Sequence, residues 1–193
     1  MEPLKVQLEM YKSFWEPKKD STLSFLPRFN ELLSQGEPPF FRCHLPGHFT
    51  ASAFVFDASF SRILLMHHAK LNKWLQPGGH ADGELNLWEA AKRELEEETG
   101  LKEVSLLTYG APFDSPLPLD IDIHEIPATK KEGRHEHFDV RFAFTTKDIK
   151  AIRGNSESLG LKWFSLPHYF EEQSMHRTVE KAKMLDNAFS VFD

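Results

Sequence analysis

Three carboxylates stand at helical spacing in the segment 93–101, which reads Arg-Glu-Leu-Glu-Glu-Glu-Thr-Gly-Leu. On a helix, Glu94, Glu97 and Glu98 are related by i, i+3 and i+4 spacing and therefore project from one face. Like charges on one face repel by about 0.2–0.5 kcal/mol per pair. A bound cation would remove that cost, and magnesium prefers oxygen ligands between carboxylates and substrate phosphates. The alternative is a solvated acidic face whose ion-pair partners are Lys92 and Arg93.

The residues on either side of these carboxylates form a more specific pattern. From Gly79 to Leu101 the sequence resembles the Nudix box, G-x5-E-x7-R-E-U-x-E-E-x-G-U, in which U is a bulky aliphatic residue. The preceding Trp-Leu-Gln-Pro-Gly-Gly at 74–79 is also similar to the strand and turn that lead into this box. The chain is thus identified, by resemblance, as a member of the Nudix hydrolase family.

One position departs from the box. Its first glutamate falls on Leu85, and the nearest acidic residues are Asp82 and Glu84. In the family this glutamate mostly supports the loop and the metal shell, so a rearranged loop could offer one of these neighbours instead. The departure leaves open an alternative function, a non-catalytic nucleotide-binding or regulatory Nudix domain.

The resemblance implies a fold and a set of site residues. The fold is a Nudix-type α/β/α sandwich with a mixed sheet. The ligands of Mg²⁺ or Mn²⁺ would be the carboxylates of Glu94, Glu97 and Glu98 and the carbonyl oxygen of Gly79. Arg93 would orient a glutamate through an ion pair without touching the substrate.

The implied reaction is hydrolysis of a diphosphate linkage. A diphosphate repels hydroxide, and bound metal ions offset this charge and lower the pKa of a water molecule. A carboxylate then takes the proton of that water. Glu94 is one candidate base. Glu157 is another, because many family members supply a glutamate from the loop at the corresponding late position in the chain. The alternative is that Glu157 is an exposed loop carboxylate without a catalytic role. Candidate substrates are nucleotide sugars, ADP-ribose, dinucleotides, nucleoside triphosphates and capped RNA ends.

Two later segments alternate polar and apolar residues with the period of a strand. One face of each collects the polar residues: His135, His137, Asp139 and Arg141 in one, Asp120, Asp122 and His124 in the other. We consider a solvated face, a substrate-binding wall of Arg141, His137 and Asp139, and a transition-metal site of His135, His137 and a carboxylate.

The aromatic residues and the single cysteine suggest further roles. Trp74, Trp88 and Trp163 could each stack on a base, although core packing is their commoner use. An isomerase on a Nudix-like fold is expected to use a catalytic cysteine, but Cys43 lies before the main domain and in no matching context. With one cysteine, the chain can form no intrachain disulfide.

The elements that must position these residues follow from periodicity and turn residues. Apolar residues predict helices over 4–15 and 23–33, with Asp20 or Ser21 as N-cap of the second and Gly36 as its stop. Further on we predict strands at 51–57, 62–67, 103–110, 120–126, 135–145 and 160–164, and helices at 87–99, ending at Gly100, and 177–189. The chain is therefore expected to be α/β, with an N-terminal helical extension at 1–47 and a Nudix domain at 48–193.

The composition limits the partners. The chain has 193 residues and a formal net charge of −6, with no basic face of the kind that binds nucleic-acid phosphates. We therefore expect a small nucleotide-like diphosphate as substrate and no DNA. The N-terminus lacks a signal-peptide core and no apolar run could span a bilayer, which predicts a cytoplasmic protein without membrane contact. Assembly into a homodimer stays open.

Overall fold

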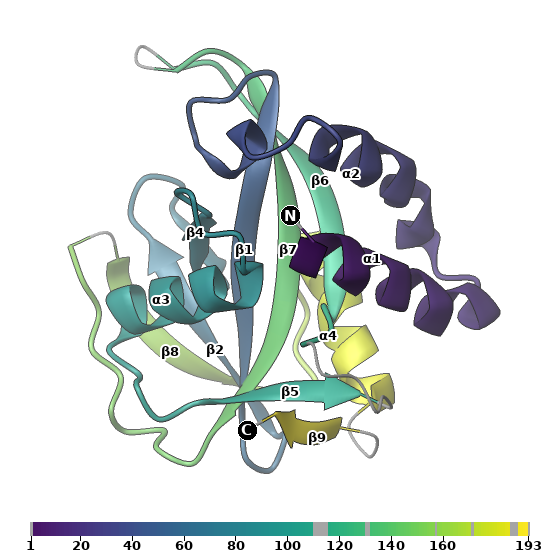
Figure 1. Ribbon diagram of the computed structural model, residues 1–193. Helices are drawn as coiled ribbons and strands as arrows, with labels where there is room; N and C mark the ends of the chain where they lie inside the picture. Colours follow the sequence, from purple (N-terminus) through teal and green to yellow (C-terminus); the bar gives the residue numbers. More distant parts are fainter. Residues whose placement is uncertain are drawn as a thin grey trace.

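A long parallel pair of strands lies at the centre of the molecule. Strands β1 (Gly47–Asp57) and β7 (His135–Thr146) pair in parallel from Gly47 opposite Glu136 to Asp57 opposite Thr146. Every residue of β1 is buried. A strand buried on both faces needs cover on both sides of the sheet, and helices α3 and α4 lie on opposite sides of it (Figure 1).

The computed structural model describes residues 2–109, 116–129, 132–156, 158–170, 172–185 and 189–192. Within them, nine strands form one mixed sheet, in the order β3-β2-β1-β7-β5-β9, with β4 also paired to β1, β6 to β7 and β8 to β2. The remaining strands are β2 (Arg62–His68), β3 (Lys73–Leu75), β4 (Gly78–His80), β5 (Ser105–Tyr109), β6 (Asp120–Ile126), β8 (Ser158–Ser165) and β9 (Phe189–Phe192). The predicted α/β fold with a mixed sheet and N-terminal helices is confirmed.

Helix α3 (Leu87–Thr99) has the bounds that the sequence predicts. Its stripe of Leu87, Ala91 and Leu95 is buried against the sheet, as expected for apolar residues four positions apart. Gly100 ends the helix in the left-handed conformation, with φ 72°, and its N–H donates to the carbonyl of Glu96. The adjacent stripe, which carries Glu94 and Glu98, faces the loop around β4.

The N-terminal segment contains two α-helices, α1 (Glu2–Trp15) and α2 (Leu26–Leu33). Asp20 caps the short 3₁₀ helix Ser21–Phe25 by accepting a hydrogen bond from the N–H of Thr22. The single helix predicted over 23–33 is therefore wrong in one respect, since a 3₁₀ turn precedes α2. Pro27, in the first turn of α2, needs no N–H donor there. The division of the chain at residue 47 stays a prediction.

The C-terminal prediction needs a larger correction. Helix α4 runs over Gln173–Leu185, not 177–189, and Phe189 lies in β9, which pairs antiparallel with β5. A four-residue strand gives no periodic signal, so its pairing with β5 decides its conformation. None of the helices in these ranges is long and apolar enough to cross a membrane.

Candidate active site

Two glycines bring the backbone of β4 against helix α3. Gly78 and Gly79 pair with Ser52 and Ala51 of β1. A Cβ on Gly78 would lie 2.7 Å from the carbonyl oxygen of Ala51, and one on Gly79 would lie 2.6 Å from the carboxyl carbon of Glu94. Gly78 therefore has no room for a side chain, and a side chain at Gly79 would displace the carboxyl of Glu94, which lies directly on the backbone of the loop.

The three carboxylates differ in exposure and in their partners. Glu98 is buried and accepts a hydrogen bond of 2.9 Å from the N–H of Gly78. Glu94, with a 14% exposed side chain, lies against Gly79, whereas the Glu97 side chain is 58% exposed. The helix thus presents two anchored carboxylates and one solvent-facing carboxylate.

Arg93 joins helix α3 to the loop. Its Nη1 donates to Glu94 at 2.7 Å and lies 3.6 Å from a carboxylate oxygen of Glu97. Its Nη2 donates to the carbonyl oxygen of His80 at 2.9 Å. This geometry suits the positioning role that the resemblance implies for Arg93.

The charges of this cluster fit a hard divalent cation. Burial raises the pKa of Glu94, Arg93 opposes the shift, and the charges of Glu97 and Asp82 add to it. The carboxylates therefore destabilise one another's ionised forms. The donor set consists of carboxylate oxygens beside a backbone loop, which is the set that magnesium and manganese prefer.

Leu85 does not belong to this cluster, because its partly buried side chain packs on the hydrophobic core. The two acidic neighbours also have other partners. Asp82 accepts hydrogen bonds from Nε, at 2.7 Å, and Nη2 of Arg42, and Glu84 accepts one of 2.8 Å from the N–H of Asn86 at the start of α3. The candidate ligand set is thus Glu94, Glu97 and Glu98 without a substitute for the first box glutamate.

The N-terminal segment holds the loop that follows β4, a role that sequence reasoning missed. The N–H of Gly83 donates to the carbonyl of Phe40 at 2.8 Å, and Arg42 pairs with Asp82. Gly83 has φ 90°, and a Cβ there would lie 2.8 Å from the ring of Phe41. An ion pair between residues 40 positions apart has no local sequence signal, which is why the pattern alone could not reveal it.

Glu157, the second candidate base, lies outside the described residues, so its role stays a prediction. Residues shortly before it contact the C-terminal part of α3. The N–H of Arg153 donates to the carbonyl of Thr99 at 2.6 Å, and the side-chain amide of Asn155 donates to the carbonyl of Glu97 at 3.2 Å. Residues 153–155 therefore lie beside the helix that carries the three carboxylates.

Most of the polar strand face is buried, so the solvated-face interpretation is wrong for its aspartates and Arg141, whereas the side chain of His124 is 43% exposed. Asp139 is 2% exposed and Arg141 is 3% exposed. The guanidinium nitrogens of Arg141 donate to Asp139, Asp122, Ser174 and Thr178. Because all its nitrogens bond to the protein, Arg141 has a structural role here, and contact of Arg141 and Asp139 with substrate stays a prediction. His137 lies instead among the rings of His48, His80, His124 and His135.

The three tryptophans singled out by the sequence have different surroundings. Trp163 donates from Nε1 to the carbonyl of Ile149 at 2.9 Å, and Trp88 packs on the core. Trp74 is half-buried and, with Phe164, Tyr169 and others, lines a cavity of about 210 Å³. Its ring also stacks on His67, with centroids 4.9 Å apart. Trp74 is therefore the candidate for stacking on a base.

Gly79→Ala tests the contact between the loop and Glu94. The new methyl group would push the Glu94 carboxyl away, and since a small displacement of a catalytic group can cost about 10²-fold, we expect kcat/KM to fall by about that factor. The fold should persist because the clash involves the end of a side chain. Gly160→Ala is the control, since a Cβ there meets nothing within 4 Å. Equal activity of the two variants would show that the contact does not position Glu94.

Comparisons with known proteins agree with this architecture. The model of the NUDIX domain matches residues 46–187. A NUDIX-family hydrolase from Clostridium perfringens is 29% identical, with 72% of this chain and 97% of that chain covered and a TM-score of 0.50.

Two more distant structures share the fold. The C. elegans Ap4A hydrolase is 15% identical, with coverage of 72% and 97% and a TM-score of 0.51. The E. coli dihydroneopterin triphosphate pyrophosphohydrolase is 16% identical, with coverage of 72% and 96% and a TM-score of 0.53. No curated protein sequence matches the chain.

Proposed function

The chain belongs to the NUDIX family and is a hydrolase of that family, and we propose that it uses Mg²⁺ or Mn²⁺ to cleave a phosphoanhydride bond in a small nucleotide-like substrate. One observation carries the proposal. Glu94, Glu97 and Glu98 share a helix face, and two of them are fixed against the Gly78–Gly79 backbone.

The residues of the chain would divide the work as follows. Gly78 holds the Glu98 carboxylate through its N–H, and Arg93 holds Glu94. With Glu97 and the Gly79 carbonyl, these carboxylates form the proposed ligand set. A divalent cation held there offsets phosphate charge and lowers the pKa of a water molecule.

Glu94 is our first candidate for the base. Burial raises the pKa of its carboxyl group, which increases its affinity for a proton. During attack, a water O–H bond would lose its proton to a carboxylate, a new P–O bond would form, and the bridging P–O bond would break. The leaving phosphate would carry the electron pair away. Glu157 is retained as the second candidate base.

The substrate class rests on charge and on the aromatic cavity. A net charge of −6 disfavours binding of long nucleic acids. For a small diphosphate, a single bound cation is enough to offset the negative charge of the phosphates. The two distant structures named above carry the names of different substrates, so the fold does not choose between such compounds. We propose a nucleoside diphosphate-linked molecule, for instance a nucleotide sugar or ADP-ribose, whose base stacks near Trp74.

Trp74→Ala should raise KM by about tenfold and change kcat little, because base–aromatic stacking contributes about 1–3 kcal/mol per base. The measurement is steady-state kinetics on the substrate and on an analogue that keeps the diphosphate but lacks the base. KM for the base-free analogue should stay unchanged. An equal effect on both compounds would place Trp74 outside base recognition.

The function itself is tested with a panel of diphosphate compounds, incubated with Mg²⁺ or with a chelator. We expect metal-dependent cleavage of at least one nucleotide-linked compound. If none is cleaved while a nucleotide binds measurably, the chain is a binding domain, the alternative that Leu85 suggests.

Cys43 is exposed and precedes β1, so Cys43→Ala should leave the hydrolase activity intact. Loss of activity in a folded Cys43→Ala variant would favour the isomerase.

A further inference from the structure

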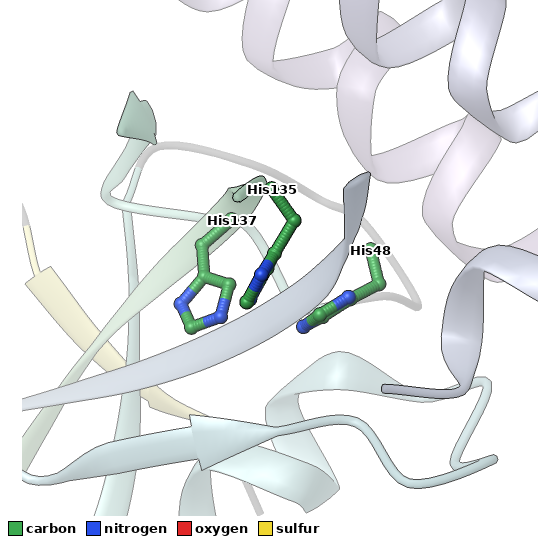
Figure 2. Close-up of side chains that lie close together, drawn as sticks. All are labelled: His48, His135 and His137. Atoms are coloured by element: carbon green, nitrogen blue, oxygen red, sulfur yellow. The ribbon is translucent and has the colours of Figure 1, made fainter. Parts of the chain in front are cut away.

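Three imidazole rings meet where β1 and β7 begin. His48 lies opposite His137 in the parallel pair, and His135 lies two residues before His137 on the same strand face. One ring nitrogen from each of these residues lies within 4.8 Å of the others. Figure 2 shows the three rings side by side and turned toward one another.

Hydrogen bonds fix the protonation pattern of two of these rings. Nδ1 of His48 lies 3.2 Å from the carbonyl oxygen of His44, and Nδ1 of His135 lies 2.7 Å from that of Gly133. A carbonyl oxygen can only accept, so Nδ1 carries the hydrogen in both rings and Nε2 keeps a free lone pair. Ligand histidines in metal sites typically show this arrangement, with the second nitrogen donating to a backbone carbonyl.

Two ring nitrogens of this cluster have no hydrogen-bond partner within the part of the chain that the structure describes. Nε2 of His48 and Nε2 of His137 are buried and have no hydrogen-bond partner among the described residues. His48 as a whole is 1% exposed. A buried polar atom without a hydrogen-bond partner destabilises the folded state. Two such atoms in one cluster therefore point to a missing ligand.

The rings are also in the state that binds metal ions. Burial, and then the neighbouring imidazoles, lower the pKa of His137 to about 2, and burial lowers the pKa of His48. Both rings are therefore neutral at pH 7. Neutral imidazole is a ligand for zinc and similar ions and a poor one for magnesium.

We propose that His48, His135 and His137 form a binding site for a transition-metal ion of the zinc class, separate from the carboxylate site on α3. Zinc–nitrogen bonds of about 2.0–2.1 Å place the nitrogen atoms of tetrahedral ligands about 3.3 Å apart. Small rotations of the rings would bring the three nitrogens, which lie within 4.8 Å of one another, to that distance. The ring centroid of His80 lies 5.1 Å from those of His48 and His137, so His80 borders the cluster. The carboxylate that the sequence suggested as third ligand is replaced by His48.

The three histidines lie next to the loop around β4, so a metal ion bound to them would affect that loop. His80 follows Gly79, and its carbonyl accepts a hydrogen bond from Arg93. A metal ion bound by the three histidines would fix the starts of β1 and β7 beside this loop. The proposal does not depend on the hydrolase activity.

The test is a zinc titration of chelator-treated, dialysed protein in excess Mg²⁺, with a chromogenic chelator as competitor. We expect one tight equivalent in the wild type and in Glu97→Gln. Cobalt(II) should give the visible absorption of a tetrahedral site, and zinc should raise Tm because it binds only the folded state. His48→Gln and His137→Gln should each weaken binding by about 100-fold or more, since each removes a ligand.

His176→Gln is the matched control, because His176 is an exposed histidine on α4. It should bind zinc like the wild type. Circular dichroism of the metal-free variants separates lost binding from lost folding, and the alternative variant His135→Gln serves if one of the others does not fold. The proposal is overturned if zinc binds folded His48→Gln and His137→Gln as tightly as the wild type, if Glu97→Gln alone abolishes binding, or if the wild type binds no equivalent tightly.

Discussion

Glu97→Gln is expected to lower kcat/KM by about 10²- to 10³-fold and to leave Tm unchanged. Its side chain is 58% exposed, so the substitution removes no packing. It removes one negative ligand from the proposed cation site, and loss of one such electrostatic contact costs about 3–4 kcal/mol in the transition state. The measurement is steady-state kinetics at saturating Mg²⁺ on the compound that the panel identifies.

Glu96→Gln is the matched control for this prediction. Glu96 is the preceding residue on α3, is exposed, and pairs with Lys102 at 3.3 Å. It points away from the face of Glu94, Glu97 and Glu98 because successive helical residues do not share a face. Its kcat/KM should stay within about twofold of the wild type. Equal losses in both variants would mean that the helix charge as a whole, and not a ligand set, supports activity.

Asp120→Ala is expected to reduce the free energy of unfolding by about 3–5 kcal/mol. Asp120 is fully buried and accepts hydrogen bonds from Lys181 and Thr178 at 2.7 Å, Arg177 at 3.1 Å and Tyr11 at 3.2 Å. Its removal deprives the buried ammonium group of Lys181 of its closest ion-pair partner. The cluster joins α1 to α4, so the loss should affect the whole domain and appear in denaturant unfolding.

Glu125→Ala provides the comparison on the same strand. Glu125 pairs with Arg134, and both side chains are largely exposed. An exposed ion pair contributes little, so the change in unfolding free energy should stay below about 1 kcal/mol. If Asp120→Ala costs no more than Glu125→Ala, the buried cluster does not stabilise the fold as we describe.

Local patterns predicted helix α3 and the carboxylate face correctly. Leu87, Ala91 and Leu95 mark its buried stripe, and Gly100 marks its end. Both signals depend only on residues within a few turns, so sequence spacing determines them. The same spacing places Glu94 and Glu98 on the loop-facing side.

Long-range packing decided what the sequence could not. Strand alternation correctly placed Asp139 and Arg141 on one face, but it could not show that α4 covers that face. The groups that satisfy Arg141 include Ser174 and Thr178, which are 33 and 37 residues away in the chain. His48 likewise joins His137 only through the parallel pairing of β1 with β7.

The most direct test of the central claim is hydrolysis in ¹⁸O-labelled water with Mg²⁺, followed by mass spectrometry of both products. The account predicts one label per turnover, bound to phosphorus in one product, and no turnover with chelator. Label on carbon, or cleavage that persists without a divalent cation, would contradict metal-assisted attack of water on a phosphoanhydride.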